Sequence, residues 1–233
     1  MAQKSGINAQ YNVAKADSVP VRVAAWQRRR MFDRFLARFA LPNPARSLLD
    51  IGVTSDRSYE ASNYLEAWYP YKDRVTAAGI DNAKFLETLY PGMRFVEADA
   101  CNMPFGDGAF DIVHASAVIE HVGSADRQRR MIAECARVGR QGFFITTPNR
   151  WFPIEFHTVL PLVHWLPKRQ FRALMRATGR AFFAEESNLN LMTAADLLRL
   201  GQQACGESYV VSLETEALLG WPANLLLIGK RRD

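Results

Sequence analysis

The stretch that decides the fold is Ser47-Leu48-Leu49-Asp50-Ile51-Gly52-Val53-Thr54-Ser55-Asp56. A short apolar run contains an acid near its end, and Gly52 follows at once. This pattern is typical of a buried parallel strand that delivers a turn to the carboxyl edge of a doubly wound sheet, where such sheets bind their ligands. Two strands predicted further along the chain lead to acids in the same way, at Asp81 and Asp99.

Alternating strands and helices are predicted on both sides of this stretch, from apolar runs and from apolar residues at helical spacing. We expect strands over residues 46–51, 74–80, 94–98, 110–115, 142–146, 209–213 and 225–229, and helices over residues 21–40, 59–68, 83–89, 126–138 and 194–204. The arginines of the first helix fall mostly on its polar side, which predicts a solvated face. The fold class is therefore α/β: a three-layer, Rossmann-like, seven-stranded, mostly parallel sheet with an antiparallel edge strand, because the last two strands follow each other closely.

A break in this alternation suggests how the chain is divided. Residues 1–45 are expected to form an N-terminal arm and helix, and residues 46–233 to form the main domain. Within that domain, residues 149–190 carry Pro153, Pro161 and Pro167 and many aromatic side chains. We interpret residues 149–190 as an aromatic, proline-rich lid insertion over the sheet edge.

Composition sets bounds on the class of protein. The chain has 233 residues, a formal net charge of +5 and three widely spaced cysteines without a CxxC pair, which indicates reduced thiols in a cytoplasmic protein. The first residues lack the apolar run of a signal peptide, and no apolar stretch is long enough to span a membrane. Basic residues are scattered and no recognition motif accompanies them, so we expect no nucleic-acid partner.

The acids at the predicted strand ends point to an adenosine-containing ligand. A carboxylate at Asp81, over the cleft, can accept hydrogen bonds from both hydroxyls of a ribose. One at Asp99 can accept from the exocyclic amine of adenine, and the turn at Gly52 would let a ligand approach the backbone. A Rossmann dehydrogenase would need Gly-x-Gly-x-x-Gly here, and residues 52–57 supply only its first glycine.

Several motifs in order resemble the class I S-adenosylmethionine-dependent methyltransferases, especially the small-molecule enzymes related to ubiquinone biosynthesis methyltransferases. The segments that carry the resemblance are Leu49-Asp50-Ile51-Gly52, Gly79-Ile80-Asp81, Val96-Glu97-Ala98-Asp99-Ala100, Met103-Pro104-Phe105, Phe110-Asp111-Ile112-Val113 and Ile119-Glu120-His121-Val122. The resemblance covers about residues 46–150 and implies methyl transfer from S-adenosyl-L-methionine to a small-molecule acceptor. A hydroxyl oxygen, on an acceptor that is amphiphilic or carries a sugar, is the expected target.

The resemblance also implies which residues contact the cofactor. Asp81 would hold the ribose hydroxyls, and Asp99 with Ala100 would meet the adenine. The remaining positions expected at the cofactor are Asp50, Gly52, Ala115 and Ser116.

The first loop departs from the family pattern of Asp-x-Gly-x-Gly-x-Gly. Thr54 and Asp56 stand at the later glycine positions, and Asp50 and Asp81 are 81 − 50 = 31 residues apart, against ~20 in the usual nucleotide-binding motif. This leaves open an alternative in which a non-catalytic protein of this fold binds a partner through residues 149–190.

Candidate catalytic residues are His121, at the predicted cleft rim, and Glu155 and His157 in the insertion. Each offers a proton acceptor for a hydroxyl nucleophile, and each has an alternative role in packing. In some relatives a metal is bound around Glu-x-x-Glu-His on the segment after the fourth strand. Here Ala117 stands at the first position of that pattern, leaving Glu120 and His121.

A metal site would therefore need His157 or His164 to complete it. We expect no metal site in this protein. The apolar and basic run over residues 160–169 is interpreted as lid core with a charged rim, so peripheral membrane contact is not favoured.

Overall fold

The computed structural model describes residues 19–57 and 60–232. Most of the predicted N-terminal arm, residues 1–18, lies outside these described residues. The seven predicted strands are all present, and their observed bounds differ from the expected ones by a few residues. They are β1 (Leu48–Ile51), β2 (Val75–Gly79), β3 (Arg94–Glu97), β4 (Phe110–Ser116), β5 (Gly139–Pro148), β6 (Tyr209–Leu218) and β7 (Trp221–Arg231).

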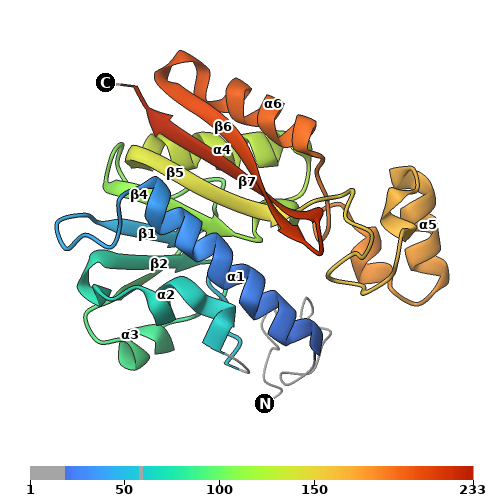
Figure 1. Ribbon diagram of the computed structural model, residues 1–233, viewed down its shortest axis with the longest axis horizontal. Helices are drawn as coiled ribbons and strands as arrows, with labels where there is room; N and C mark the ends of the chain where they lie inside the picture. The colour runs from blue at the N-terminus through green and yellow to red at the C-terminus, as the bar shows by residue number, and fades with distance from the viewer. Residues whose placement is uncertain (1–18, 58–59, 233) are drawn as a thin grey trace.

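The strands form one sheet in the order β3-β2-β1-β4-β5-β7-β6 (Figure 1). Strands β1 to β5 run parallel to one another, whereas β7 pairs antiparallel with both β5 and β6. The predicted mostly parallel sheet with antiparallel pairing at one edge is confirmed. The antiparallel strand β7 lies one place in from the edge, because the tight turn between β6 and β7 returns the chain toward β5.

Helices cover both faces of the sheet and produce the predicted three layers (Figure 1). Two helices, α4 and α6, pack on one face, and α1, α2 and α3 pack on the other. Their bounds are α1 (Val19–Arg38), α2 (Tyr64–Trp68), α3 (Phe85–Leu89), α4 (Ala125–Val138), α5 (Lys168–Ala177) and α6 (Ala194–Cys205). The predicted helix over residues 59–68 is a 3-10 turn (Glu60–Asn63) that runs into the short α2.

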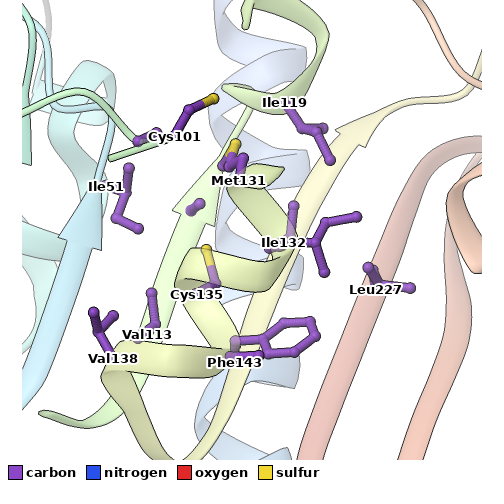
Figure 2. Packing of buried hydrophobic residues seen from close by; sticks show 14 of the residues in the cluster. Ile51, Cys101, Val113, Ile119, Met131, Ile132, Cys135, Val138, Phe143 and Leu227 are labelled. Atoms are coloured by element: carbon purple, nitrogen blue, oxygen red, sulfur yellow. The ribbon is translucent and has the colours of Figure 1, made fainter. Parts of the chain in front are cut away.

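The core on the α4 face follows from the spacing of apolar residues. Met131, Ile132 and Cys135 of α4 are fully buried against the sheet, where Val113 and Phe143 meet them (Figure 2). The hydroxyl of Ser124 caps the helix by accepting a hydrogen bond from the Arg127 amide.

Helix α1 is fixed by an apolar face and by ion pairs. Phe32 and Phe35 are buried in a second apolar core, on the face of the sheet opposite α4, to which β4 and β5 also contribute. Arg30 and Arg34 lie 2.5 and 2.6 Å from the carboxylate of Glu216, a fully buried residue of β6. Each of these two arginine side chains keeps 40% of its surface exposed, so the face is partly solvated as expected, while β6 supplies an acid opposite it.

Residues 149–190 form a small helical unit beside the sheet, around α5 and the 3-10 turns Val163–Trp165 and Ala181–Ala184 (Figure 1). Phe171, Met175 and Phe183 bury a separate apolar cluster inside this unit. Its C-terminal end is tied to the main domain, because the Asn190 amide donates to the Glu120 carbonyl over 2.8 Å. We call residues 149–190 the insertion.

The three cysteines are all buried and none forms a disulfide, in agreement with the expected reduced thiols. Within the described part of the chain, no helix has the length and apolar character required to cross a membrane.

Candidate active site

The acids predicted from the sequence lie along one edge of the sheet. Strands β3, β2 and β1 are neighbours, with Ile51 beside Ala78 and Gly79 beside Glu97. Asp50 is the next-to-last residue of β1, while Asp81 and Asp99 follow the ends of β2 and β3. The parallel topology therefore brings these three positions to the same edge, as expected.

Asp81 is held in place by the loop that follows β1. Its side chain is buried, and the Ser55 hydroxyl lies 3.3 Å from its Oδ2 atom. The loop thus reaches across from β1 to the end of β2, the position where a ribose was predicted.

Side-chain amides and hydroxyls organise this loop in place of the expected glycines. The Asn63 side chain accepts from the Thr54 amide over 2.9 Å and donates to the Thr54 carbonyl over 3.0 Å. The Thr54 hydroxyl in turn accepts from the Asp56 amide. Thr54 and Asp56 are therefore part of a defined polar turn, and the departure from the glycine pattern leaves an ordered loop.

The backbone conformation and the close packing at Gly52 both require a glycine. Its φ of +89° lies in the left-handed region that favours glycine. A Cβ atom added there would stand 2.1 Å from the Cγ2 atom of Val118, in the segment after β4. Gly52 therefore lets the β1 turn pack directly against the β4 segment.

Asp50 belongs to a buried polar network beneath this edge of the sheet. Its Oδ1 atom lies 2.5 Å from Nδ1 of His114, and Nε2 of His114 lies 2.9 Å from the Tyr64 hydroxyl. Burial raises the pKa of Asp50 to about 7, against the opposing effect of a hydrogen bond with Glu66, and burial lowers the pKa of His114 to about 4. Asp50 was expected beside the methionine part of a cofactor, but its carboxyl group contacts His114 in the protein interior.

Asp99 is engaged by helix α4. It accepts hydrogen bonds from the Arg127 guanidinium over 2.9 Å and from the Cys101 amide over 2.9 Å. Burial alone would raise the pKa of Asp99, but the Cys101 amide and Arg127 outweigh burial and lower it. The Asp99 side chain is 44% exposed, so a ligand at this edge has access to it.

The small residues expected at the cofactor contribute differently. Ala100 is buried, and Ala115 is buried completely in the core of the α4 face. The hydroxyl of Ser116, at the end of β4, shares a 2.9 Å hydrogen bond with the Thr146 hydroxyl on β5. Ala115 therefore exposes no surface in this structure, whereas Ser116 is half-buried.

The three candidate catalytic residues meet at the ends of β4 and β5, together with Glu120. We call Glu120, His121, Glu155 and His157 the histidine cluster. The rings of His121 and His157 meet edge to face with centroids 4.7 Å apart, and His121 Nε2 lies 3.8 Å from Glu120 Oε1. Nδ1 of His157 lies 2.7 Å from Oε1 of Glu155.

The charges of this cluster are set by burial and by the Glu155–His157 pair. Burial alone would raise the pKa of Glu155, but His157 outweighs burial and lowers it to about 2. Burial alone would lower the pKa of His157, and Glu155 raises it instead. Burial and the neighbouring His157 lower the pKa of His121 to about 3, while burial raises that of Glu120.

Other residues support the cluster without having been predicted. Thr147 donates its hydroxyl proton to Glu120 Oε2 over 2.8 Å, and the Asn188 carbonyl lies 2.7 Å from His121 Nδ1. Neither residue belongs to a recognisable motif, so nothing in the local sequence marks them. His164 lies apart from the cluster, with its Nε2 atom 2.7 Å from the Phe152 carbonyl.

Comparison with known proteins relates part of this chain to a family model. Residues 59–146 match the family model of a methyltransferase domain. A search of curated protein sequences found no match.

Solved structures share the fold at low sequence identity. Magnesium protoporphyrin IX methyltransferase from Synechocystis PCC 6803 is 14% identical, covers 97% of this chain and 92% of its own, and has a TM-score of 0.58. A 1,6-didemethyltoxoflavin-N1-methyltransferase from Burkholderia thailandensis is 15% identical, with 97% and 88% coverage and a TM-score of 0.60. A SAM-dependent methyltransferase from Methanosarcina mazei is 17% identical, with 84% and 96% coverage and a TM-score of 0.53. The matched domain and the strand order together show that residues 59–146 match a methyltransferase domain and that the chain has the fold of S-adenosylmethionine-dependent methyltransferases.

Proposed function

We propose that this enzyme transfers the methyl group of S-adenosylmethionine to a hydroxyl oxygen of a small molecule. The observation that supports this most strongly is the position of the histidine cluster. Strand β4, which leads into Glu120 and His121, is the direct neighbour of β1, which leads into the loop that holds Asp81. A cofactor edge and a set of proton-accepting side chains thus lie next to each other.

The residues of the cofactor edge fit an adenosine. Asp81 offers carboxylate oxygens for a ribose diol, and Ile80 beside it exposes 53% of its surface, which provides an apolar contact for a flat ring. Asp99 adds an accessible acceptor at the end of the neighbouring strand. When bound, S-adenosylmethionine supplies an electrophilic methyl group on a sulfonium sulfur, which departs as a neutral thioether when the acceptor oxygen takes the methyl.

The protein's own contribution is to orient the acceptor and to manage its proton. A hydroxyl is a weak nucleophile until its proton is lost, and the product ether cannot keep that proton. We assign this task to the histidine cluster, with His121 and His157 next to the acceptor and Glu155 holding the ring of His157 through Nδ1. Holding the acceptor and the methyl group in one geometry supplies much of the remaining rate.

Calorimetric titration with S-adenosylmethionine tests the cofactor edge. We expect one site per chain, and an Asp81→Asn variant should bind about 10- to 100-fold more weakly, because one partner of a charged hydrogen bond is worth roughly 1.5–3 kcal/mol. Asp126→Asn is the matched control, since the Asp126 side chain is 92% exposed on α4. Equal affinity for wild type and the Asp81 variant would show that the ribose site is elsewhere.

The acceptor class is tested by measuring S-adenosylhomocysteine release with a panel of small molecules that carry hydroxyl, amine or thiol groups. Turnover with hydroxyl acceptors supports the proposal. Turnover confined to amines or thiols would overturn the choice of oxygen while leaving the cofactor site intact.

A further inference from the structure

We propose that Glu120, His121 and His157 bind one divalent transition-metal cation of the Zn²⁺ type. Two of these residues follow β4, whereas His157 belongs to the insertion. A catalytic role for this cation rests on the proposed function. Binding of the cation does not depend on that function.

The three side chains converge on one point. Each offers a ligand atom, and these atoms all lie within 4.8 Å of one another. Glu120 Oε1 and His121 Nε2 are already 3.8 Å apart. Zinc bonds to nitrogen and carboxylate oxygen are about 2.0–2.2 Å long, so ligands on one ion lie ~3.4 Å apart, and a contraction of up to about 1.4 Å by side-chain rotation completes the site.

Both imidazoles are oriented as metal-binding histidines usually are. A metal-ligating histidine typically donates its other ring N–H to a carboxylate or to a backbone carbonyl, which fixes its tautomer and direction. Nδ1 of His157 lies 2.7 Å from the Glu155 carboxylate, and Nδ1 of His121 lies 2.7 Å from the Asn188 carbonyl. Each hydrogen bond assigns Nε2 as the nitrogen that a cation would take.

Glu120 supplies the independent evidence for a ligand. Its side chain is fully buried; Thr147 satisfies its Oε2 atom, but among the residues that the structure describes its Oε1 atom has no hydrogen-bond partner. Among the residues that the structure describes, no lysine or arginine forms an ion pair with Glu120 or Glu155. Buried carboxylates are normally paired with a charge or coordinate a metal, and a cation at this point would satisfy both requirements.

The donor set indicates the kind of cation. Two imidazoles and one carboxylate suit Zn²⁺ and similar transition metals, whereas Mg²⁺ and Ca²⁺ prefer oxygen ligands. Three protein ligands leave one position for the acceptor, as in catalytic zinc sites. A cation there would lower the pKa of the acceptor hydroxyl and would fix the insertion to the end of β4.

The test uses the full chain without a histidine tag, freed of metal by a chelator and titrated with Zn²⁺ or with Co²⁺ as a spectroscopic probe. We expect one ion per chain and, for Co²⁺, visible absorption bands of a nitrogen- and oxygen-ligated site. Affinity should fall at least 10-fold in His121→Gln and His157→Gln, and about 10- to 100-fold in Glu155→Gln, which weakens the hydrogen bond that orients the His157 ring. His164→Gln is the matched control, because His164 is a buried histidine of the insertion outside the cluster.

The absence of Zn²⁺ and Co²⁺ binding by folded wild type would overturn the proposal, and so would equal binding by wild type and both histidine variants. Circular dichroism confirms that each variant is folded. Calorimetry with S-adenosylmethionine in the presence of the chelator separates the two proposals. Cofactor binding without any metal binding would leave the proposed methyltransferase function standing, with His121 and His157 as bases. Metal binding without cofactor binding would leave the metal site standing and would overturn the proposed function.

Discussion

The imidazole rings of His121 and His157 meet at 89° with their centroids 4.7 Å apart, although one follows β4 and the other belongs to the insertion. The contact depends on how the insertion is attached. The Asn190 amide donates to the Glu120 carbonyl, and the Asn188 carbonyl holds the His121 ring. The insertion is thus attached at Glu120 and His121, next to the contact that His157 makes.

Glu120→Gln should separate metal binding from stability. The glutamine oxygen can still accept from Thr147, so the metal-free variant should be within about 1 kcal/mol of metal-free wild type in free energy of unfolding. Zn²⁺ at about 100 times its dissociation constant should add ~2.7 kcal/mol to wild type and little to the variant. Urea denaturation with and without Zn²⁺ measures both effects, and equal stabilisation of the two proteins would contradict the role of Glu120.

Gly52→Ala should destabilise the fold by about 3 kcal/mol, because a left-handed φ and an overpacked contact each cost roughly 1–3 kcal/mol. Adding Val118→Ala should recover the part that comes from the clash with Val118 Cγ2. Gly106→Ala is the control, since a Cβ there meets nothing within 4 Å. If chemical denaturation shows similar losses for both glycines, the packing argument is wrong.

The buried network around Asp50 should make stability depend on pH. Burial raises the pKa of Glu66 well above 4.5 and that of Asp50 from 3.8 to about 7. The folded state therefore binds these protons more tightly than the unfolded state, and their contribution to stability is present at low pH and is lost as pH rises through the folded pKa values. His114, lowered from 6.5 to about 4, acts in the opposite direction only below pH 6.5.

The free energy of unfolding should accordingly fall as pH rises above 6.5 through the folded pKa of Asp50, about 7, where His114 is neutral in both states, and should continue to fall until Glu66 has also lost its proton. Glu66→Gln should reduce this fall. Glu207→Gln, at an exposed position, should leave it unchanged. Denaturation curves across this range decide the matter, and an unchanged slope in the Glu66 variant would remove Glu66 from the explanation.

Glu216→Ala should lower the free energy of unfolding by about 2 kcal/mol, because it removes a buried acid that pairs with Arg30 and Arg34 of α1. The side chains of the two arginines are 40% exposed, which keeps the loss below the roughly 3–5 kcal/mol of a fully buried pair. Glu214→Ala, whose side chain is 21% exposed, should cost less than about 1 kcal/mol. Hydrogen exchange should show faster opening of α1 in the first variant. Equal losses would mean that burial of Glu216 has no special effect.

Local sequence determined the architecture of this protein. Apolar runs and helical spacing are properties of short segments, so they predicted all seven strands and the helices that cover them. The acids at the edge followed from topology alone, because parallel strands deliver their carboxyl ends to one side. The predicted bounds were least accurate at residues 59–68, where a polar turn held by Asn63 and Thr54 replaces part of a helix.

Tertiary structure decided which side chains meet. Asp50 lies opposite His114 because β1 and β4 pair in that register, and a strand's own sequence does not state the register of its neighbour. Glu216 meets the arginines of α1 in the same unpredictable way. The stretch from Ser47 to Asp56 therefore predicted the sheet edge at which the three acids gather, but only the folded chain joined Glu120 and His121 to His157, because that contact depends on how the insertion packs back on the sheet.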